Sequence, residues 1–327
     1  SSSKDLCVII TARNARDTIG DAIASALAQP QVTEIVLVDD ASSDDTAAAA
    51  RQASNGDSRL TVIRLDHNVG PAAARNRAIE ASHAPFIAIL DADDYFLPDR
   101  ATVLLGQSDW DLIADNIVFV AESQTARVTR DELPGAYTKD IMDISTEDFI
   151  RGNIPSKVVN RGELGFLKPI LSRAFLEAHE LRYDETLRLG EDYDLYVRML
   201  AFGARFRVIS EIGYVARVRP TSLSGRHGGS DLAALYDASQ RHAVLPLKTQ
   251  DRQALRDYLA NLRARYLLHA FLETKRDHGL LSAMAFSLKP PMNFPTIVRG
   301  VMRSKLQKRR GSENSEPEPN RFLLPVG

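Results

Sequence analysis

The stretch from Phe86 to Asp94, FIAILDADD, decides the fold class of this chain. An apolar run with β propensity ends directly in a group of carboxylates, as when a buried strand opens into a loop. Carboxylate oxygens on such a loop are the hard ligands that Mg²⁺ and Mn²⁺ prefer. Asp-x-Asp alone is usually a solvated turn, but its place after a buried strand predicts a metal site, with Asp93 as the direct ligand and Asp91 beside it.

Three earlier stretches repeat this arrangement, so the first hundred residues alternate strands with helical patterns. The runs 6–10, 35–38 and 60–65 read as strands, and the helices between them begin behind Asp17, at 43–45 and at Gly70-Pro71. This alternation predicts an α/β fold with a Rossmann-like, mainly parallel central sheet flanked by helices. Each strand ends in a polar cluster, and in parallel sheets the ligand lies outside those ends. The alternative is that Asp, Asn and Ser only form turns there.

After residue 110 the pattern changes to mixed short strands and helices, with one capped helix expected at 145–152. Beyond Asp231 it is helical through Arg276, and Pro290-Pro291 breaks it. From Gly311 the acidic and proline-rich composition is typical of a disordered end. The chain is therefore expected to comprise a Rossmann-like half, a mixed half, a helical region and a tail.

Composition excludes several classes of protein. The 327 residues carry a net charge of -2, so no global positive field draws the chain to nucleic acid. Cys7 is the only cysteine, so no disulfide forms within the chain, which suits a reducing compartment. No apolar run approaches the roughly 20 residues that span a bilayer, and the start has no signal-peptide pattern. We expect a cytoplasmic protein.

Two stretches in the first half predict a nucleotide site. Asp39 follows the second strand, where a carboxylate can accept hydrogen bonds from a ribose or base, while Asp40 either joins it or caps a turn. Asp91 is a second candidate for the ribose hydroxyls. Arg75, one turn into its helix, either meets a base or phosphate or faces solvent. Residues 11–14 lack the glycines of a dinucleotide fingerprint, which argues against NAD or FAD.

The downstream stretch from Gly190 to Leu195, GEDYDL, predicts a general base. If Gly190 caps a helix, Glu191 and Asp192 lie in its first turn, where the helix dipole favours ionised carboxylates. An ionised carboxylate can accept the proton of an attacking hydroxyl. The alternative, that these acids only stabilise the helix start, is common.

Together these stretches resemble glycosyltransferase family 2, inverting enzymes with the GT-A fold, from Val8 to about Ser224. The motifs follow the order of the family, and six in order are far more specific than one. They are Thr11 to Asn14, Val38 to Ser42, Asn68 to Asn76, Asp91 to Asp94, Tyr183 to Glu185 and Gly190 to Leu195.

The resemblance implies roles for the candidate residues. Asp192, or its neighbour Glu191, would be the catalytic base, and Asp93 with Asp91 would bind Mg²⁺ or Mn²⁺. The nucleotide would be held by Thr11, Ala12, Arg13, Asp39, Arg75, Asp91, Ala92 and Arg219. The chain departs from the family at 11–14, which lacks the usual Pro-x-Tyr-Asn, and at 217–219, where many members carry a histidine.

The resemblance also divides the chain. Residues 1–110 would bind the nucleotide sugar, 111–230 would bind the acceptor and hold the base, 231–310 would form a helical extension, and 311–327 the disordered tail. The chain is most similar to the glucosyltransferases of bacterial succinoglycan-type exopolysaccharide synthesis, which implies UDP-glucose, a β-linked product and a lipid-linked saccharide acceptor. An apolar and basic stripe over 294–310 either docks on the inner membrane surface or packs on the protein.

Two other functions fit parts of the pattern. A sugar-phosphate nucleotidyltransferase would also bind a metal and a nucleotide, but it needs a glycine-rich phosphate loop after the first strand, and 11–17 contains no glycine. If the chain were a non-catalytic protein that binds a nucleotide sugar, the carboxylate of Asp192 would have no evident function.

Overall fold

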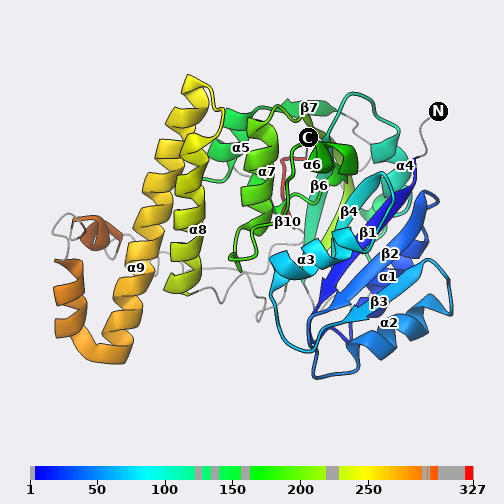
Figure 1. The fold of residues 1–327 in the computed structure, drawn as a ribbon, viewed down its shortest axis with the longest axis horizontal. Coiled ribbons are helices and arrows are strands. Elements are labelled where there is room, and N and C mark those ends of the chain that lie inside the picture. Colours follow the sequence, from blue (N-terminus) through cyan, green and yellow to red (C-terminus); the bar gives the residue numbers. More distant parts are fainter. Residues whose placement is uncertain are drawn as a thin grey trace. The chain divides into compact units, whose positions relative to one another are not determined.

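The computed structural model describes residues 4–121, 127–133, 140–155, 163–218, 228–288, 293, 295–300 and 321–326 (Figure 1). The chain forms two compact units. Unit 1 contains residues 1–219 and 320–327, and unit 2 contains residues 220–319.

Four parallel strands form the first part of the sheet in unit 1, as predicted. They are β1 (Leu6–Ala12), β2 (Val32–Asp39), β3 (Leu60–Arg64) and β4 (Phe86–Asp91), in the order β3-β2-β1-β4. The central strands are buried because helices flank the sheet: α1 (Ile19–Leu27) and α2 (Thr46–Ser54) pack on each other, and α3 (Pro71–Glu80) packs on β1 and β2.

The sheet continues with strands of mixed direction, which confirms the predicted change of pattern. β4 pairs antiparallel with β8 (Ile170–Ser172), β8 antiparallel with β6 (Leu112–Ala121), and β6 parallel with β9 (Phe206–Val218). The short strands β5 (Tyr95–Phe96) and β7 (Ile141–Ile144) pair antiparallel with β9. The remaining helices of this unit are α4 (Arg100–Leu105), η1 (Arg130–Glu132), α5 (Thr146–Gly152), η2 (Leu164–Phe166), α6 (Arg173–Ala178) and α7 (Glu191–Ala201).

Most predicted helix starts are confirmed, and one is wrong. Pro71 is the first residue of α3, and the Ser145 side chain accepts a hydrogen bond from Asp148 N at the start of α5. Asp17 is not the cap of α1. The N-cap is Thr18, one residue later, and the exposed Asp17 side chain lies 3.5 Å from Arg16.

The end of the chain also differs from the expectation of disorder. Residues 321–326 are ordered, and β10 (Arg321–Phe322) pairs antiparallel with β6. Leu323 and Leu324 are buried, and the Asn116 side chain binds both the N–H (2.8 Å) and the carbonyl (3.1 Å) of Leu324. The acidic residues that suggested disorder precede this apolar end, and residues 301–320 lie outside the described ranges.

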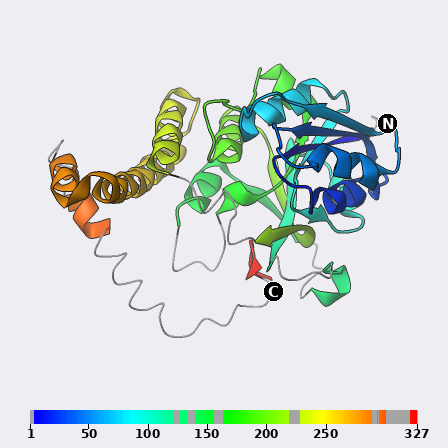
Figure 2. The same cartoon turned by 90° about the horizontal axis from the view of Figure 1, so that it is seen from below.

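Unit 2 is helical where the structure describes it (Figure 2). α8 (Gly229–Arg241) packs along α9 (Thr249–Ser287), with the short η4 (His242–Val244) between them. The Glu273 side chain of α9 accepts a hydrogen bond from Gly229 N, which fixes the start of α8. α9 bends at Gly279, whose φ of 83° is not helical. Among the described residues, no helix has both the length and the hydropathy needed to cross a bilayer.

Candidate active site

The predicted polar clusters meet because the strands that carry them are parallel neighbours. Thr11, near the end of β1, pairs in register with Asp91 on β4, and Ala12 pairs with Asp39 on β2. Ala92, directly after β4, is buried, whereas Arg13 is exposed. The structure therefore brings the stretches that follow β1, β2 and β4 together at the carboxyl ends of these parallel strands.

Asp39 and Asp40 have different surroundings. Asp40 accepts hydrogen bonds from the Asn68 side chain (2.9 Å) and from the backbone N–H of Val69 (2.7 Å) and Gly70 (3.0 Å), so it holds the turn before α3. Asp39 is fully buried, and its Oδ1 accepts a hydrogen bond from Ser42 N. Its Oδ2 accepts no hydrogen bond from the described residues and lies 3.8 Å from Arg64 Nε. Since a buried acceptor without a donor is costly, this atom is suited to an N–H or O–H of a ligand.

Arg75 points into the site from α3. Its guanidinium lies 3.1 Å from Asp91 Oδ1, 2.7 Å from Glu191 Oε1 and 2.9 Å from Asp192 Oδ1. Its neighbour Asn76 is also buried, but it binds the backbone of Tyr183 instead. Glu191 and Asp192 of α7 are therefore linked to Asp91 at the end of β4 through one buried arginine.

Lys168 is a site residue that sequence reasoning missed. It precedes β8, and its Nζ lies 2.9 Å from Asp91 Oδ2 and 3.0 Å from Asp192 Oδ2. The one available signal was a charged residue inside the apolar run Phe166 to Leu171, FLKPIL. A lysine is rarely buried without a partner, so this signal indicated that Lys168 meets a carboxylate.

Asp192 lies in the first turn of α7, as predicted, and its side chain is buried. Gly190 is the N-cap with a φ of 74°, in the left-handed region. Asp192 Oδ1 accepts hydrogen bonds from Arg75 and from the Tyr183 hydroxyl (3.2 Å), whereas Oδ2 accepts one from Lys168. A carboxylate oxygen has two acceptor positions, so Oδ2 can accept a further hydrogen bond.

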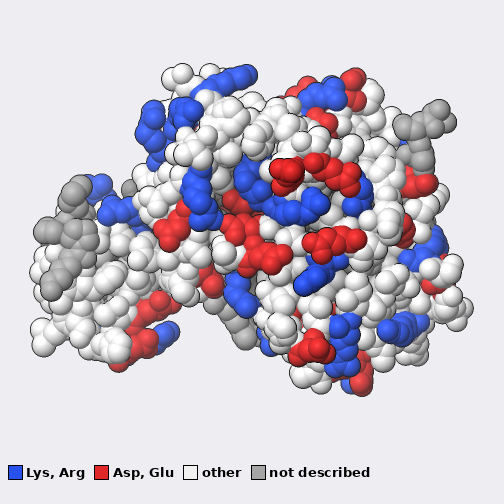
Figure 3. All heavy atoms as spheres, in the orientation of Figure 1, with Lys and Arg blue, Asp and Glu red and all other residues white. Residues whose placement is uncertain are grey.

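The five ionic side chains of this network, which we call the site cluster, are Arg75, Lys168, Asp91, Glu191 and Asp192. Three carboxylates and two cations leave one negative charge in excess. Burial acts to raise the pKa of Asp91, but the charges of Lys168 and Arg75 outweigh it and lower the pKa to about 2. Acidic and basic side chains lie next to one another in the middle of the face drawn in Figure 3.

Asp93 and Asp94 have separate surroundings. Asp94 is buried and accepts hydrogen bonds from the Tyr214 hydroxyl (2.8 Å) and Arg217 N (2.9 Å), so it fixes the loop after β4. Burial, followed by the charges of Asp93 and Asp91, raises the pKa of Asp94. Asp93 is partly exposed.

The predicted metal and diphosphate ligands are only partly described. In the described part of the chain, no three His, Cys, Asp or Glu side chains are grouped so that they alone could hold a metal. Arg219, the candidate for the diphosphate, lies outside the described residues. Both oxygens of Asp91 already pair with cations, Oδ1 with Arg75 and Oδ2 with Lys168.

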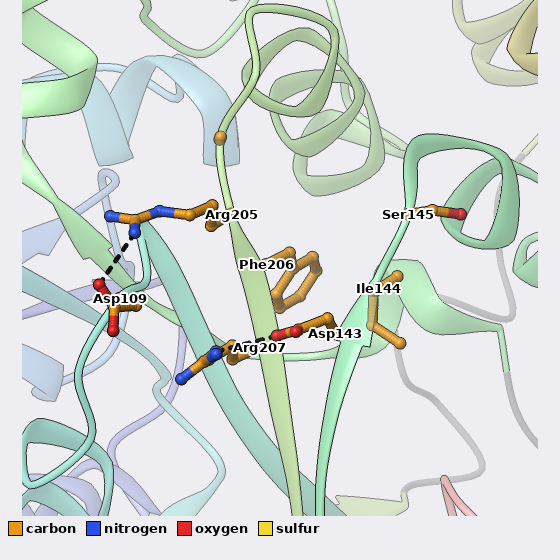
Figure 4. Close-up of a pocket in the computed structure, with 8 residues that line it drawn as sticks. Asp109, Asp143, Ile144, Ser145, Arg205, Phe206 and Arg207 are labelled. Carbon is orange, nitrogen blue, oxygen red and sulfur yellow. Dashed lines mark hydrogen bonds and ion pairs between the residues drawn. The ribbon is translucent and has the colours of Figure 1, made fainter.

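A separate hollow of about 520 Å³ lies at the opposite edge of the sheet, where β9 begins (Figure 4). Its charged residues pair with one another, Arg205 with Asp109 at 3.2 Å and Arg207 with Asp143 at 2.9 Å. It contains none of the predicted site residues and is not the candidate active site.

Comparison with known proteins gives three findings. The family model for glycosyl transferase family 2 matches residues 7–155. The succinoglycan biosynthesis protein ExoU of Rhizobium meliloti (strain 1021) is 48% identical over 318 residues, which covers 96% of this chain and 91% of that protein. The Escherichia coli protein WfaP, a UDP-Glc:alpha-D-GlcNAc-diphosphoundecaprenol beta-1,3-glucosyltransferase, is 40% identical over 94 residues, covering 28% of this chain and 37% of that protein.

The fold is also similar to a solved structure. The crystal structure of S. aureus TarS 1-349 in complex with UDP has a TM-score of 0.61 and 18% sequence identity, and the match covers 92% of each chain. At this level of identity the similarity concerns the fold alone.

Proposed function

The chain belongs to glycosyltransferase family 2, and from this premise we propose that it transfers glucose from UDP-glucose to a saccharide acceptor with inversion at the anomeric carbon. The family membership expected from the six motifs is confirmed by the 48% identity to ExoU over most of both chains, and the chain is accordingly a glycosyltransferase. The predicted GT-A fold is confirmed by its similarity to TarS.

One observation carries the proposed mechanism. The carboxylate at the end of β4 and the carboxylate in the first turn of α7, about a hundred residues apart, join a single buried network through Arg75 and Lys168. An inverting transfer requires a donor site and a base on opposite sides of one sugar, and this network holds a candidate for each. A purely structural helix start would not require Asp192 to be buried.

The donor site is assigned to the ends of β1, β2 and β4. Asp39 Oδ2 is a buried acceptor suited to an N–H of the base or a hydroxyl of the ribose. Ala12 pairs with Asp39, Thr11 and Arg13 adjoin Ala12 along the chain, and Ala92 follows Asp91, which pairs with Thr11 from the other side of β1. UDP-glucose as the donor is supported by the name of WfaP. Arg75 is assigned to hold the carboxylates, since these are what its guanidinium contacts.

A divalent cation, Mg²⁺ or Mn²⁺, is proposed to accompany the donor. The site cluster has one negative charge in excess, so a diphosphate would be repelled without an added cation. Mg²⁺ is commonly held by one or two carboxylates together with substrate phosphates, and Asp93 can supply such a carboxylate. When bound, the cation would offset the charge that the departing diphosphate gains.

The protein's own residues are proposed to act as follows. Asp192 Oδ2 accepts the proton of the acceptor hydroxyl as its oxygen attacks the anomeric carbon. The bond from that carbon to the diphosphate breaks on the opposite side, and its electron pair leaves with the diphosphate oxygen. Arg75 and Tyr183 hold Oδ1, so the carboxylate cannot rotate away from the acceptor.

The acceptor is proposed to be a lipid-linked saccharide of exopolysaccharide synthesis, reached at the cytoplasmic face of the membrane. The names of ExoU and WfaP support this acceptor class. Peripheral membrane contact remains a proposal, because most of the stripe over 294–310 lies outside the described residues. Ile297 is buried within unit 2, so this member of the stripe packs inward. Flotation of the full chain with anionic liposomes, against a chain ending near Pro290, tests the contact, and equal flotation would exclude it.

A single incubation distinguishes the candidate functions. The protein is mixed with UDP-glucose, Mn²⁺ and a saccharide acceptor, and the released phosphates are identified. Release of UDP is the expected result. Pyrophosphate release that depends on UTP would instead indicate a nucleotidyltransferase, and no release of either would indicate a non-catalytic protein that binds nucleotide sugars.

A further inference from the structure

Lys168 has so far been assigned no contact with the substrate, yet its side chain is held firmly in the site. Its side chain is 10% exposed, and its ammonium pairs with Asp91 at 2.9 Å and with Asp192 at 3.0 Å. Burying an ammonium is costly unless it is paired. Lys168 therefore links Asp91, the carboxylate beside the donor site, with Asp192, the proposed base.

The backbone of Lys168 is also held in place. Its carbonyl accepts a 2.6 Å hydrogen bond from Arg100 Nη2, and Arg100 itself pairs with the buried Asp115 at 2.7 Å. Two residues further on, Ile170 begins β8, which pairs with both β4 and β6. The position of the ammonium is thus set by the sheet and by a buried ion pair, as a preorganised site requires.

One N–H of this ammonium is left for a ligand. Lysine has three N–H donors, and Asp91 and Asp192 account for two of them. Among the residues that the structure describes, the third has no acceptor. A donor with this position and partial exposure is suited to a substrate oxygen.

The position of Asp192 decides which part of the substrate Lys168 would meet. A base lies roughly 2.6–3.2 Å from the oxygen whose proton it takes, and that oxygen approaches the reacting carbon to about 3–3.5 Å. The ammonium is 3.0 Å from the same Asp192 Oδ2. It therefore lies next to the transferred sugar, whereas the nucleoside belongs at Asp39, at the end of β2.

We propose that Lys168 is a further catalytic residue, which holds Asp91 and Asp192 with two N–H groups and donates the third to a hydroxyl oxygen of the transferred sugar. This inference rests on the proposed function, because it requires Asp192 to be the base and a sugar nucleotide to be the donor.

The test compares Lys168→Met with the unaltered chain. Calorimetry with UDP and with UDP-glucose measures donor binding, and single-turnover UDP release with saturating acceptor measures the rate. Loss of the Lys168 charge makes the site cluster more negative and should weaken the binding of both ligands, but because UDP lacks the sugar, the Kd of UDP-glucose should rise about tenfold more than that of UDP. The rate should fall roughly 10²-fold, as when one preorganised donor is lost.

Chemical rescue separates a catalytic role from a structural one. Lys168→Cys treated with 2-bromoethylamine regains an ammonium at nearly the original reach, and the rate should return. Cys7, the only native cysteine, should not react, because burial raises the pKa of its thiol to about 12. Arg173→Met is the matched control: this part-buried cation binds Ala84 O, Ile79 O and Ser82 Oγ outside the site, so its loss should lower stability and leave the rate nearly unchanged.

The outcomes are distinct. Equal loss of affinity for UDP and UDP-glucose in Lys168→Met, or no rescue by the restored ammonium, would overturn the inference. An unchanged rate in Lys168→Met, with an active wild-type enzyme, would overturn it as well. If the wild-type chain releases no UDP from UDP-glucose, the proposed function fails instead.

Discussion

Two buried ionic networks among the described residues differ in a way that separates structure from function. The pair Arg100–Asp115 is closed: both side chains are almost fully buried, and Arg100 binds Asp115 through Nε (2.9 Å) and Nη2 (2.7 Å). The guanidinium also lies 4.5 Å from the centre of the Phe96 ring. The site cluster has three carboxylates for two cations, and the Asp91 side chain is 33% exposed.

The two networks shift the pKa of Asp115 and that of Asp91 in opposite directions. Burial raises the pKa of Asp115, although Arg100 lowers it in part. At Asp91 burial acts in the same direction, but two cations, Lys168 and Arg75, lower the pKa to about 2. A one-to-one buried pair fixes packing, whereas an unbalanced, partly open cluster is prepared for a charged ligand. The predictions below test the closed pair, the site cluster and the residues around the cluster separately.

The largest expected effect comes from breaking the closed pair. Asp115→Asn removes the only carboxylate that the structure shows against Arg100, leaving a buried uncompensated cation. The free energy of unfolding should fall by about 3–5 kcal/mol, measured by urea denaturation. Gly213→Ala should act in the same direction, since an added Cβ would lie 1.9 Å from Asp115 Oδ2.

An exposed pair is the control for this prediction. Asp109 and Arg205 form an ion pair at 3.2 Å, and both side chains are more than half exposed. Asp109→Asn should change the unfolding free energy by no more than about 1 kcal/mol. Equal losses in Asp109→Asn and Asp115→Asn would contradict the distinction between buried and exposed pairs.

The next effect concerns the metal that is proposed to offset the charge excess of the site cluster. Asp93→Ala should weaken UDP binding at least tenfold, about 1.4 kcal/mol, and added Mg²⁺ or Mn²⁺ should not restore it. Calorimetry with and without EDTA measures this. Unchanged UDP affinity in both Asp93→Ala and the EDTA-treated enzyme would exclude the metal assignment.

A smaller effect is expected at the nucleotide end of the site. Asp39→Asn replaces one acceptor oxygen with an NH₂ group, which cannot accept a hydrogen bond from the base or ribose. UDP binding should weaken by about 1–2 kcal/mol. Asp40→Asn is the matched control, because Asp40 binds Val69 and Gly70, and its loss should lower stability more than affinity. If Asp40→Asn weakened UDP binding and Asp39→Asn did not, Asp40 would be the residue that binds the nucleotide.

Local patterns were sufficient to predict the strands and helix starts that carry the candidate donor residues. The strands ending at Ala12, Asp39 and Asp91, the helix after Gly70 and the first turn of α7 all follow from residues close in sequence. The likeness to family 2 then linked Asp91 with Asp192, which spacing alone could not do.

The features that were missed depend on pairing between distant segments. Lys168 reaches Asp91 only because β8 pairs antiparallel with β4. Arg100 and Asp115 look like ordinary surface charges until α4 and β6 are packed together. Leu323 and Leu324 follow an acidic stretch, and Asn116, which orders them, lies about two hundred residues earlier. Composition and periodicity do not report contacts of this kind.

The most direct test of the account is the single-turnover rate of Asp192→Asn with donor and acceptor saturating. Asparagine keeps the shape of the side chain but cannot take the acceptor proton, so the rate should fall roughly 10²- to 10⁴-fold, while UDP affinity should barely change. Glu191→Gln is the control, since Glu191 contacts Arg75 and points about 100° away around the helix. A larger loss of rate in Glu191→Gln than in Asp192→Asn would identify Glu191 as the base. Unchanged rates in both variants would contradict the proposed mechanism.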